Sequence, residues 1–85
     1  MKPTLDLTHH AHDVLKAREI RYIWVFETVN FPEAMLRDIH DAQLTHALRR
    51  IPERGNRVLR VVYNHTSDPP RVVTAYFDRT LKGKL

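Results

Sequence analysis

Two β-rich runs joined by a turn constrain the fold of this chain more than any other feature. Residues 57–64 read RVLRVVYN and residues 71–77 read RVVTAYF, with HTSDPP between them. Valine and tyrosine are enriched in strands, while proline, aspartate and serine are typical of the turns that connect them. The two runs therefore predict a pair of antiparallel strands.

Side-chain alternation assigns the residues of these strands to two faces. On the more apolar face, which we expect to pack against the core, we place Leu59, Val61, Tyr63, Val73, Ala75 and Phe77. On the opposite face we place Val58, Arg60, Val62, Val72, Thr74 and Tyr76. Arg60, Thr74 and Tyr76 are therefore expected together on the open side of the sheet, away from the helices.

A third strand is predicted over residues 44–51, LTHALRRI, before a turn around Gly55. Its register is left open by the sequence, because polar residues occur at both odd and even positions. It adds to the open side of the sheet either one pair or the other: His46 and Arg50, or Thr45 and Arg49.

The N-terminal half is predicted to contain the helices. Apolar residues recur at helical spacing within residues 9–19, and Thr8 stands where an N-cap is expected. A second helix is predicted over residues 21–30 and ends before Pro32, although the β-branched and aromatic residues of YIWVFETV would also suit a strand. Residues 4–7, TLDL, are consistent with a short edge strand.

The order of these elements predicts an α+β fold. Residues 33–43 are read as a mostly irregular connection with a helical turn. Helices and strands that are kept apart along the chain favour two helices packed on one face of a three- to four-stranded antiparallel sheet. With 85 residues, the chain is expected to be a single domain over residues 1–85.

Charge and composition narrow the classes of partner. The net charge is +4 with neutral histidines, and the basic excess lies in the C-terminal half, which favours a polyanionic partner. There is no cysteine, so disulfides and cysteine chemistry are excluded. No apolar stretch is long enough to cross a bilayer and the N-terminus lacks a hydrophobic signal region, so we expect a cytoplasmic protein without a membrane partner.

Four segments carry a resemblance to a known group of proteins. THHAHDVLKAREI, NFPE, THALRRIPERGNRVLRVVYN and RVVTAYFDR resemble an uncharacterised family of small bacterial proteins. The architecture of that family is similar to the BrnT and RelE-like toxins, which are small metal-independent ribonucleases neutralised by an antitoxin. The resemblance implies a RelE/BrnT-like fold, RNA as the target, including mRNA on the ribosome, and an antitoxin protein as partner.

The family pattern matches this chain residue by residue at His10, Arg18, Arg60, Thr74, Tyr76 and Arg79. Two positions depart from it. Glu19 stands where many relatives have glycine, and a left-handed residue there costs about 1 kcal/mol without glycine, so the helix is expected to end differently. Arg21 stands where relatives often have a serine or threonine cap and is a poor cap itself.

Metal-free RNA cleavage needs a base for the 2′-OH, cations for the phosphate and an acid for the leaving oxygen. Histidine titrates near neutral pH, and the arginine fork binds two phosphate oxygens at once. The candidate catalytic residues are His10, His46, Arg60 and Tyr76. The candidate residues for binding RNA phosphates are Arg18, Arg50, Thr74 and Arg79.

Each candidate also has a structural interpretation. His10 suits the role of a histidine at the start of a helix that hydrogen-bonds a neighbouring loop, and Arg18 suits an ion pair or a bond to carbonyls at the end of the helix. Arg60 suits an ion pair, and its replacement by lysine separates the two roles. A phosphate-binding Arg60 predicts weaker RNA binding with little loss of stability, whereas a structural Arg60 predicts mainly a lower melting temperature.

The cluster HHAH raises the question of a metal. His9 and His12 lie three residues apart, but no third ligand has a recognisable spacing, so neither a metal nor another cofactor is expected. The leading hypothesis is a toxin-like, RNA-directed and metal-independent ribonuclease. The alternatives are a non-catalytic binding module and a small homodimeric housekeeping protein on the same fold.

Overall fold

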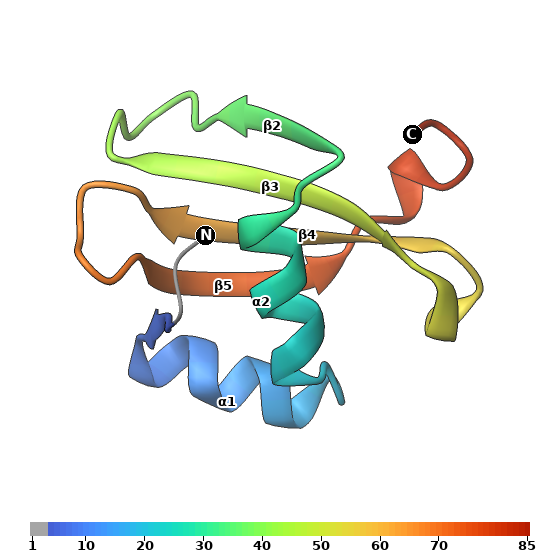
Figure 1. The fold of residues 1–85 in the computed structure, drawn as a ribbon, viewed down its shortest axis with the longest axis horizontal. Coiled ribbons are helices and arrows are strands. Elements are labelled where there is room, and N and C mark those ends of the chain that lie inside the picture. Colours follow the sequence, from blue (N-terminus) through green and yellow to red (C-terminus); the bar gives the residue numbers. More distant parts are fainter. Residues whose placement is uncertain (1–3) are drawn as a thin grey trace.

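A five-stranded sheet with two α-helices on one face makes up the structure, a computed structural model that describes residues 4–85 (Figure 1). In chain order, the strands and α-helices are β1 (Asp6–Leu7), α1 (His9–Ala17), α2 (Tyr22–Asn30), β2 (Ala34–Arg37), β3 (Leu44–Ile51), β4 (Arg57–Asn64) and β5 (Arg71–Phe77). Two short 3-10 helices follow β3 and β5, namely η1 (Pro52–Arg54) and η2 (Arg79–Leu81). The predicted α+β class is confirmed.

The strand order of the sheet is β1-β5-β4-β3-β2. Strands β2 to β5 run antiparallel to their neighbours, whereas β1 runs parallel to β5. The predicted meander is confirmed, because β3, β4 and β5 span the three predicted runs. The expected three- to four-stranded antiparallel sheet was wrong in size and type, because short strands at both edges produce a five-stranded mixed sheet.

Strand β2 lies where the sequence predicted an irregular connection with a helical turn, so that prediction was wrong. Its four residues pair with β3 along their whole length, from Ala34 opposite Leu48 to Arg37 opposite Thr45. Most of the strand is exposed, so it has no buried face that would impose alternation on its sequence. Pairing with a long neighbour, rather than a local pattern, explains this strand.

Helix α1 is defined by specific contacts at both ends. The Thr8 hydroxyl accepts a hydrogen bond from the Ala11 N–H at 3.0 Å, which confirms the predicted N-cap. At the C-terminus, Glu19 has a φ of 55°. The Ile20 N–H bonds the Leu15 carbonyl at 2.9 Å, as in a Schellman motif. The helix therefore ends in the left-handed conformation despite the missing glycine, and the expectation of a different ending was wrong.

The segment that could have been a helix or a strand forms helix α2. Its buried residues, Trp24, Val25, Thr28 and Val29, lie on one helical face toward the sheet. Trp24 meets Phe77 of β5 edge-on, with ring centroids 6.3 Å apart. No side chain caps its start at Arg21, as the sequence predicted. Neither this helix nor α1, within residues 4–85, is long and apolar enough to span a bilayer.

The core lies between the helices and one face of the sheet. Leu59, Val61 and Tyr63 of β4 are buried in it, as alternation predicted. On β5 the pattern is interrupted, because Val62 pairs with Thr74 whereas the next residue, Tyr63, pairs with Val72. This irregularity places Val72, and not the predicted Val73, in the core cluster.

Candidate functional site

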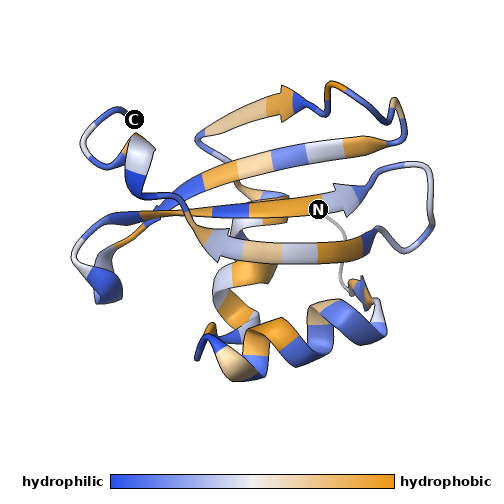
Figure 2. Cartoon of the chain, turned by 180° about the vertical axis from the view of Figure 1, so that it is seen from behind, coloured by the Kyte–Doolittle hydropathy of each residue, from blue (hydrophilic) through white to orange (hydrophobic). Residues whose placement is uncertain are grey.

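Figure 2 shows toward the viewer the sheet face that is turned away from the helices, and the strand pairing places several polar residues on this face. The pairing places Leu48 of β3, Arg60 of β4 and Tyr76 of β5 in one row. His46 is opposite Val62, which in turn is opposite Thr74. The open register is thus settled, since His46 and Arg50 belong to this open face. The expectation that Arg60, Thr74 and Tyr76 share it is confirmed.

A continuous chain of hydrogen bonds crosses the open face from the loop after β2 to the loop after β5. The Asp38 carboxylate lies 2.8 Å from His46 Nε2, and His46 Nδ1 lies 2.9 Å from Arg60 Nη1. On its other side, Arg60 Nε donates to Asp78 Oδ2 at 3.0 Å, and Nη2 lies 2.9 Å from the same oxygen. We call these four residues, Asp38, His46, Arg60 and Asp78, the open-face chain.

The partners of His46 determine its tautomer. A guanidinium can only donate hydrogen bonds, so Nδ1 of His46 must accept the bond from Arg60. The proton of the neutral ring then sits on Nε2 and is donated to Asp38. The imidazole is therefore held in one orientation, with its acceptor nitrogen directed at Arg60.

The two carboxylates at the ends of the open-face chain are kept ionised by their hydrogen bonds. The pKa of Asp38 lies below its usual value, first because His46 donates a hydrogen bond to it and next because the His40 N–H does so. The pKa of Asp78 is also lowered, chiefly by the hydroxyl of Thr80, with the Arg60 guanidinium contributing further. Both ends of the chain therefore carry negative charge at neutral pH.

Arg60 keeps capacity for a ligand. Its two hydrogen bonds and the ion-pair contact of Nη2 engage three of the five guanidinium N–H groups and leave two, and only 15% of the side chain is exposed. Tyr76 is directly opposite Arg60 on β5, and its hydroxyl has no hydrogen-bond partner among residues 4–85. Thr74, one pair further along the same face, likewise has a free hydroxyl among the described residues.

The remaining basic candidates are placed differently. Arg50 forms a two-pronged ion pair with Glu33, at 2.7 Å between Nη2 and Oε2. Arg18 donates from Nη1 to the Ala75 carbonyl of β5 at 2.8 Å, whereas the sequence suggested a bond to carbonyls at the end of its own helix. Arg79 lies exposed in η2.

His10 does not join this group. It is an exposed residue of the first turn of α1, and α1 packs against the face of the sheet opposite to Arg60. The structure therefore does not bring His10 together with Arg60, because the sheet separates the two side chains. His46, the other candidate histidine, lies on the adjacent strand and contacts Arg60.

Two acids of the open-face chain were not predicted. Asp78 continues the period-two pattern of Thr74 and Tyr76, so alternation could have identified it. Asp38 lies in a loop and reaches His46 only because β2 folds back on β3. No local signal in the sequence announces that contact.

The histidines at the start of α1 form a separate exposed group. His9 and His12 lie 3.5 Å and 3.8 Å from carboxylate oxygens of Asp13. Across residues 4–85, no three histidine, cysteine, aspartate or glutamate side chains are grouped so as to hold a metal ion.

Comparison with known proteins identifies the family. No curated protein and no solved structure matches the chain. A family model described as a domain of unknown function, DUF4258, matches residues 7–77, which include both α-helices and all strands except the first residue of β1. Arg60, His46 and Asp38 fall within that region, and Asp78 follows it directly. The chain therefore belongs to the DUF4258 family.

Proposed function

We propose that this protein is an RNA-directed, metal-independent ribonuclease of the RelE/BrnT toxin type, with its active site on the open face of the sheet. The observation that carries the proposal is the hydrogen bond between His46 and Arg60, backed by Asp38 and flanked by Tyr76. A base, a phosphate-binding cation and a hydroxyl acid are thereby within one small area. The basic excess of the C-terminal half supports a polyanionic substrate.

The proposed reaction is attack of a ribose 2′-OH on the adjacent phosphate. His46 Nδ1 takes the proton of the 2′-OH while the oxygen forms a bond to phosphorus. Arg60 binds the phosphate oxygens as negative charge develops on them. The bond from phosphorus to the 5′ oxygen breaks, and the Tyr76 hydroxyl gives its proton to the leaving oxygen. The products are a 2′,3′-cyclic phosphate and a free 5′-hydroxyl.

Substrate binding is part of this mechanism. In the free protein, the Arg60 Nη1 occupies the acceptor nitrogen of His46. A phosphate that binds Arg60 competes for this N–H and releases Nδ1 to act as a base. Asp38 keeps the proton on Nε2 and stabilises the imidazolium that forms, because its carboxylate lies 2.8 Å from that nitrogen.

The test is cleavage of a short single-stranded RNA in excess chelator. We expect a 2′,3′-cyclic phosphate product from the parent, no product when the ribose at the cleaved position lacks its 2′-OH, and a loss of at least about 100-fold in His46→Gln. Lys16→Gln, which changes an exposed lysine of α1, is the control. Cleavage that chelator abolishes and one divalent ion restores would show the mechanism to be wrong.

A non-catalytic RNA-binding module is the second candidate, and one observation favours it. Both ring nitrogens of His46 already have partners, so the residue could serve only to orient Arg60. In that case the parent binds RNA but cleaves none, and His46→Gln lowers affinity without changing any product.

An antitoxin partner belongs to the same proposal. Expression of the chain alone should arrest bacterial growth, and Arg60→Ala should relieve the arrest at equal protein level. Harmless high-level expression of the parent would count against the toxin proposal but would not exclude RNA binding. If the purified protein were also a dimer, the small homodimeric housekeeping alternative would be favoured.

A further inference from the structure

We propose that a cavity at the rim of the sheet holds a second backbone phosphate of the RNA strand, flanking the phosphate bound by Arg60. This inference rests on the proposed function, since it deepens the description of the same substrate. The cavity has a volume of about 300 Å³ and lies where β5 ends and β4 begins. It is lined by Arg57, Asp78, Arg79 and Lys82, and we call it the rim cavity.

The rim cavity carries excess positive charge. Three of its four lining residues are cations, and among residues 4–85 none of these three has a carboxylate within ion-pair distance. The one acid, Asp78, is already satisfied. Its Oδ2 is bound by Arg60, and its Oδ1 accepts from the Thr80 hydroxyl at 2.6 Å and the Thr80 N–H at 3.0 Å. Elsewhere on the surface, Arg50 and Arg71 are each paired with an acid.

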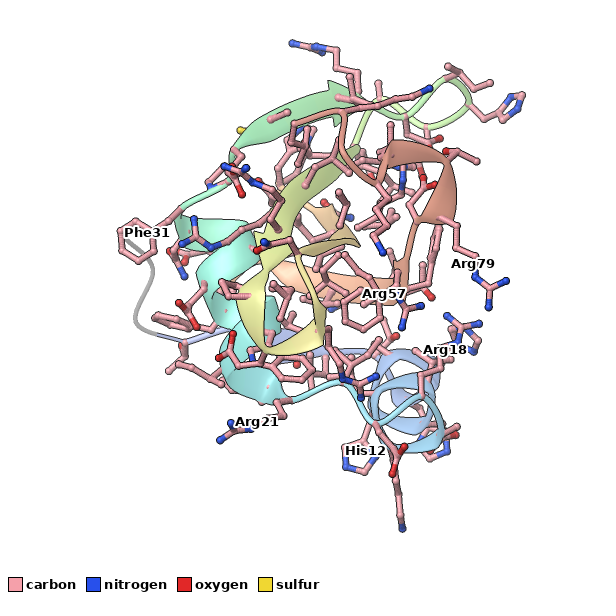
Figure 3. The ribbon with its side chains drawn as sticks, turned by 90° about the vertical axis from the view of Figure 1, so that its right-hand side faces the viewer. His12, Arg18, Arg21, Phe31, Arg57 and Arg79 are labelled. Carbon is pink, nitrogen blue, oxygen red and sulfur yellow. The ribbon has the colours of Figure 1, made fainter. Side chains whose placement is uncertain are left out.

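Two of these cations are held at the cavity by neighbouring residues. The Arg57 guanidinium lies over the Phe77 ring at 4.6 Å, a cation–π contact that holds it at the cavity. Asp78 caps the short helix η2, which carries Arg79. Figure 3 shows Arg57 and Arg79, which both line the cavity, on the same side of the molecule. A partly fixed set of donors loses less conformational entropy on binding an anion.

The position of the cavity indicates which anion it takes. Asp78 forms part of its wall and also holds Arg60, so the cavity and the open-face chain share a residue. A ligand that binds both must carry at least two negative groups, as the successive phosphates of a nucleic acid strand do. The cavity volume is at the lower end of the range for small-molecule pockets, which suits one phosphate with part of its nucleotide. Single-stranded RNA fits both conditions.

The test compares two double variants with equal loss of charge. Arg79→Gln/Lys82→Gln removes two cations of the rim cavity, whereas Lys16→Gln/Lys84→Gln removes two exposed cations that do not line it. The probe is a fluorescent 2′-O-methyl hexauridine, which cannot be cleaved through a 2′-OH. We expect affinity to fall about tenfold in the cavity variant and less than about twofold in the control, at low salt.

Salt dependence gives a second readout. Loss of one phosphate contact on a single strand should reduce the slope of log affinity against log salt by about 0.7 in the cavity variant, with little change in the control. Equal slopes or equal affinities for the two double variants would overturn the inference. Melting curves for both variants verify that a loss of affinity does not reflect unfolding.

The outcomes separate this inference from the proposed ribonuclease. If the parent cleaves RNA and both double variants bind the hexamer alike, the inference about the rim cavity is wrong and the proposed ribonuclease activity is supported. If the parent does not cleave RNA, and only the cavity variant loses affinity for the hexamer, the inference about the rim cavity is supported and the proposed catalysis is wrong. If inorganic phosphate shifts the amide resonances of residues 78–82 but the hexamer does not, the cavity takes a free anion and the inference is wrong.

Discussion

At the scale of single residues, Arg60 is bound on both sides, and this decides what its replacement should do. One edge of the guanidinium bonds Asp78 and Nη1 bonds His46. A lysine ammonium carries the same charge but cannot reach two groups in the same fixed geometry. The structural pairing weighed from the sequence is therefore present, and we propose that the same side chain also binds phosphate.

We expect Arg60→Lys to lower the free energy of unfolding by about 1–3 kcal/mol, because one partly buried acceptor loses its donor. This differs from the sequence-based expectation that a phosphate-binding Arg60 could be replaced with little loss of stability. The matched control is Arg50→Lys, whose side chain is 49% exposed and pairs with Glu33 at the surface. Such a pair contributes about 0–1 kcal/mol. Urea unfolding of the three proteins measures the difference.

The same three proteins also report on function. If Arg60 binds phosphate, Arg60→Lys should weaken RNA binding more than Arg50→Lys at a temperature where both are folded. Equal unfolding energies for the two variants would show that the open-face chain contributes little to stability, and the structural role of Arg60 would then be wrong.

What the sequence predicts at this scale depends on how local the contact is. Arg60, Thr74 and Tyr76 could be placed on one face because alternation has a period of two. The choice between His46 and Thr45 could not be made, because strand register depends on pairing with β4. Asp38 could not be found at all, since its contact depends on the return of β2.

At the scale of elements, the irregular pairing in β5 offers a test with neighbouring valines. Val72 is fully buried in the core, whereas Val73 is only partly buried. We expect Val72→Ala to lower the free energy of unfolding by about 2 kcal/mol through lost burial and a cavity. Val73→Ala should cost less than about 1 kcal/mol. The reverse order, measured by urea unfolding, would restore the uninterrupted alternation that the sequence predicted.

The end of α1 offers a stabilising substitution. Glu19 adopts a left-handed φ of 55°, which costs an L-residue about 1 kcal/mol and glycine nothing. We expect Glu19→Gly to raise the free energy of unfolding by about 0.5–1 kcal/mol, since the group of Glu19 that accepts a hydrogen bond from Arg54 is its backbone carbonyl, which glycine retains. Glu19→Ala keeps the strain and serves as the control. A glycine variant no more stable than the alanine variant would contradict this account.

Long, patterned elements were therefore predictable, and short or interrupted ones were not. The three meander strands and the two helices follow from periodicity and from the Thr8 cap. The four residues of β2 are exposed and carry no pattern, so only pairing with β3 defines them. The irregularity in β5 is at Val73, which the pairing skips, and its neighbour Val72 is also a valine, so the residue types do not reveal the change of face.

At the scale of the whole molecule, three carboxylates connect the loops and edges of the open face to its strands. Asp38 bonds His46, Asp78 bonds Arg60, and Glu33 bonds Arg50. The pKa of Glu33 is lowered mainly by the Arg50 side chain, and the other two carboxyl pKa values are lowered as well. The stability of the sheet should therefore depend on pH in the acid range.

The sign of this dependence follows from the direction of the shifts. A carboxyl whose pKa is lower in the folded state stabilises the fold above its unfolded pKa, which is about 4. That stabilisation is lost as the pH falls through the lowered folded value. We expect the melting temperature of the parent to be nearly level from pH 7 to 5 and to fall steeply below about pH 4.

A carboxylate-to-amide variant isolates the contribution of the open-face chain. Asp38→Asn/Asp78→Asn should melt below the parent at pH 7, because an amide cannot form the same charged bonds with His46 and Arg60. At pH 2 the parent carboxyls are protonated as well, so the difference between the two proteins should nearly vanish. Glu53→Gln removes an exposed carboxylate of η1 that has no side-chain partner among residues 4–85, and its melting curve should follow the parent throughout. The contrary result is a difference in melting temperature between the parent and the double variant that stays constant from pH 7 to 2. It would show that the amides act through altered packing and that charge on the open face does not stabilise the sheet.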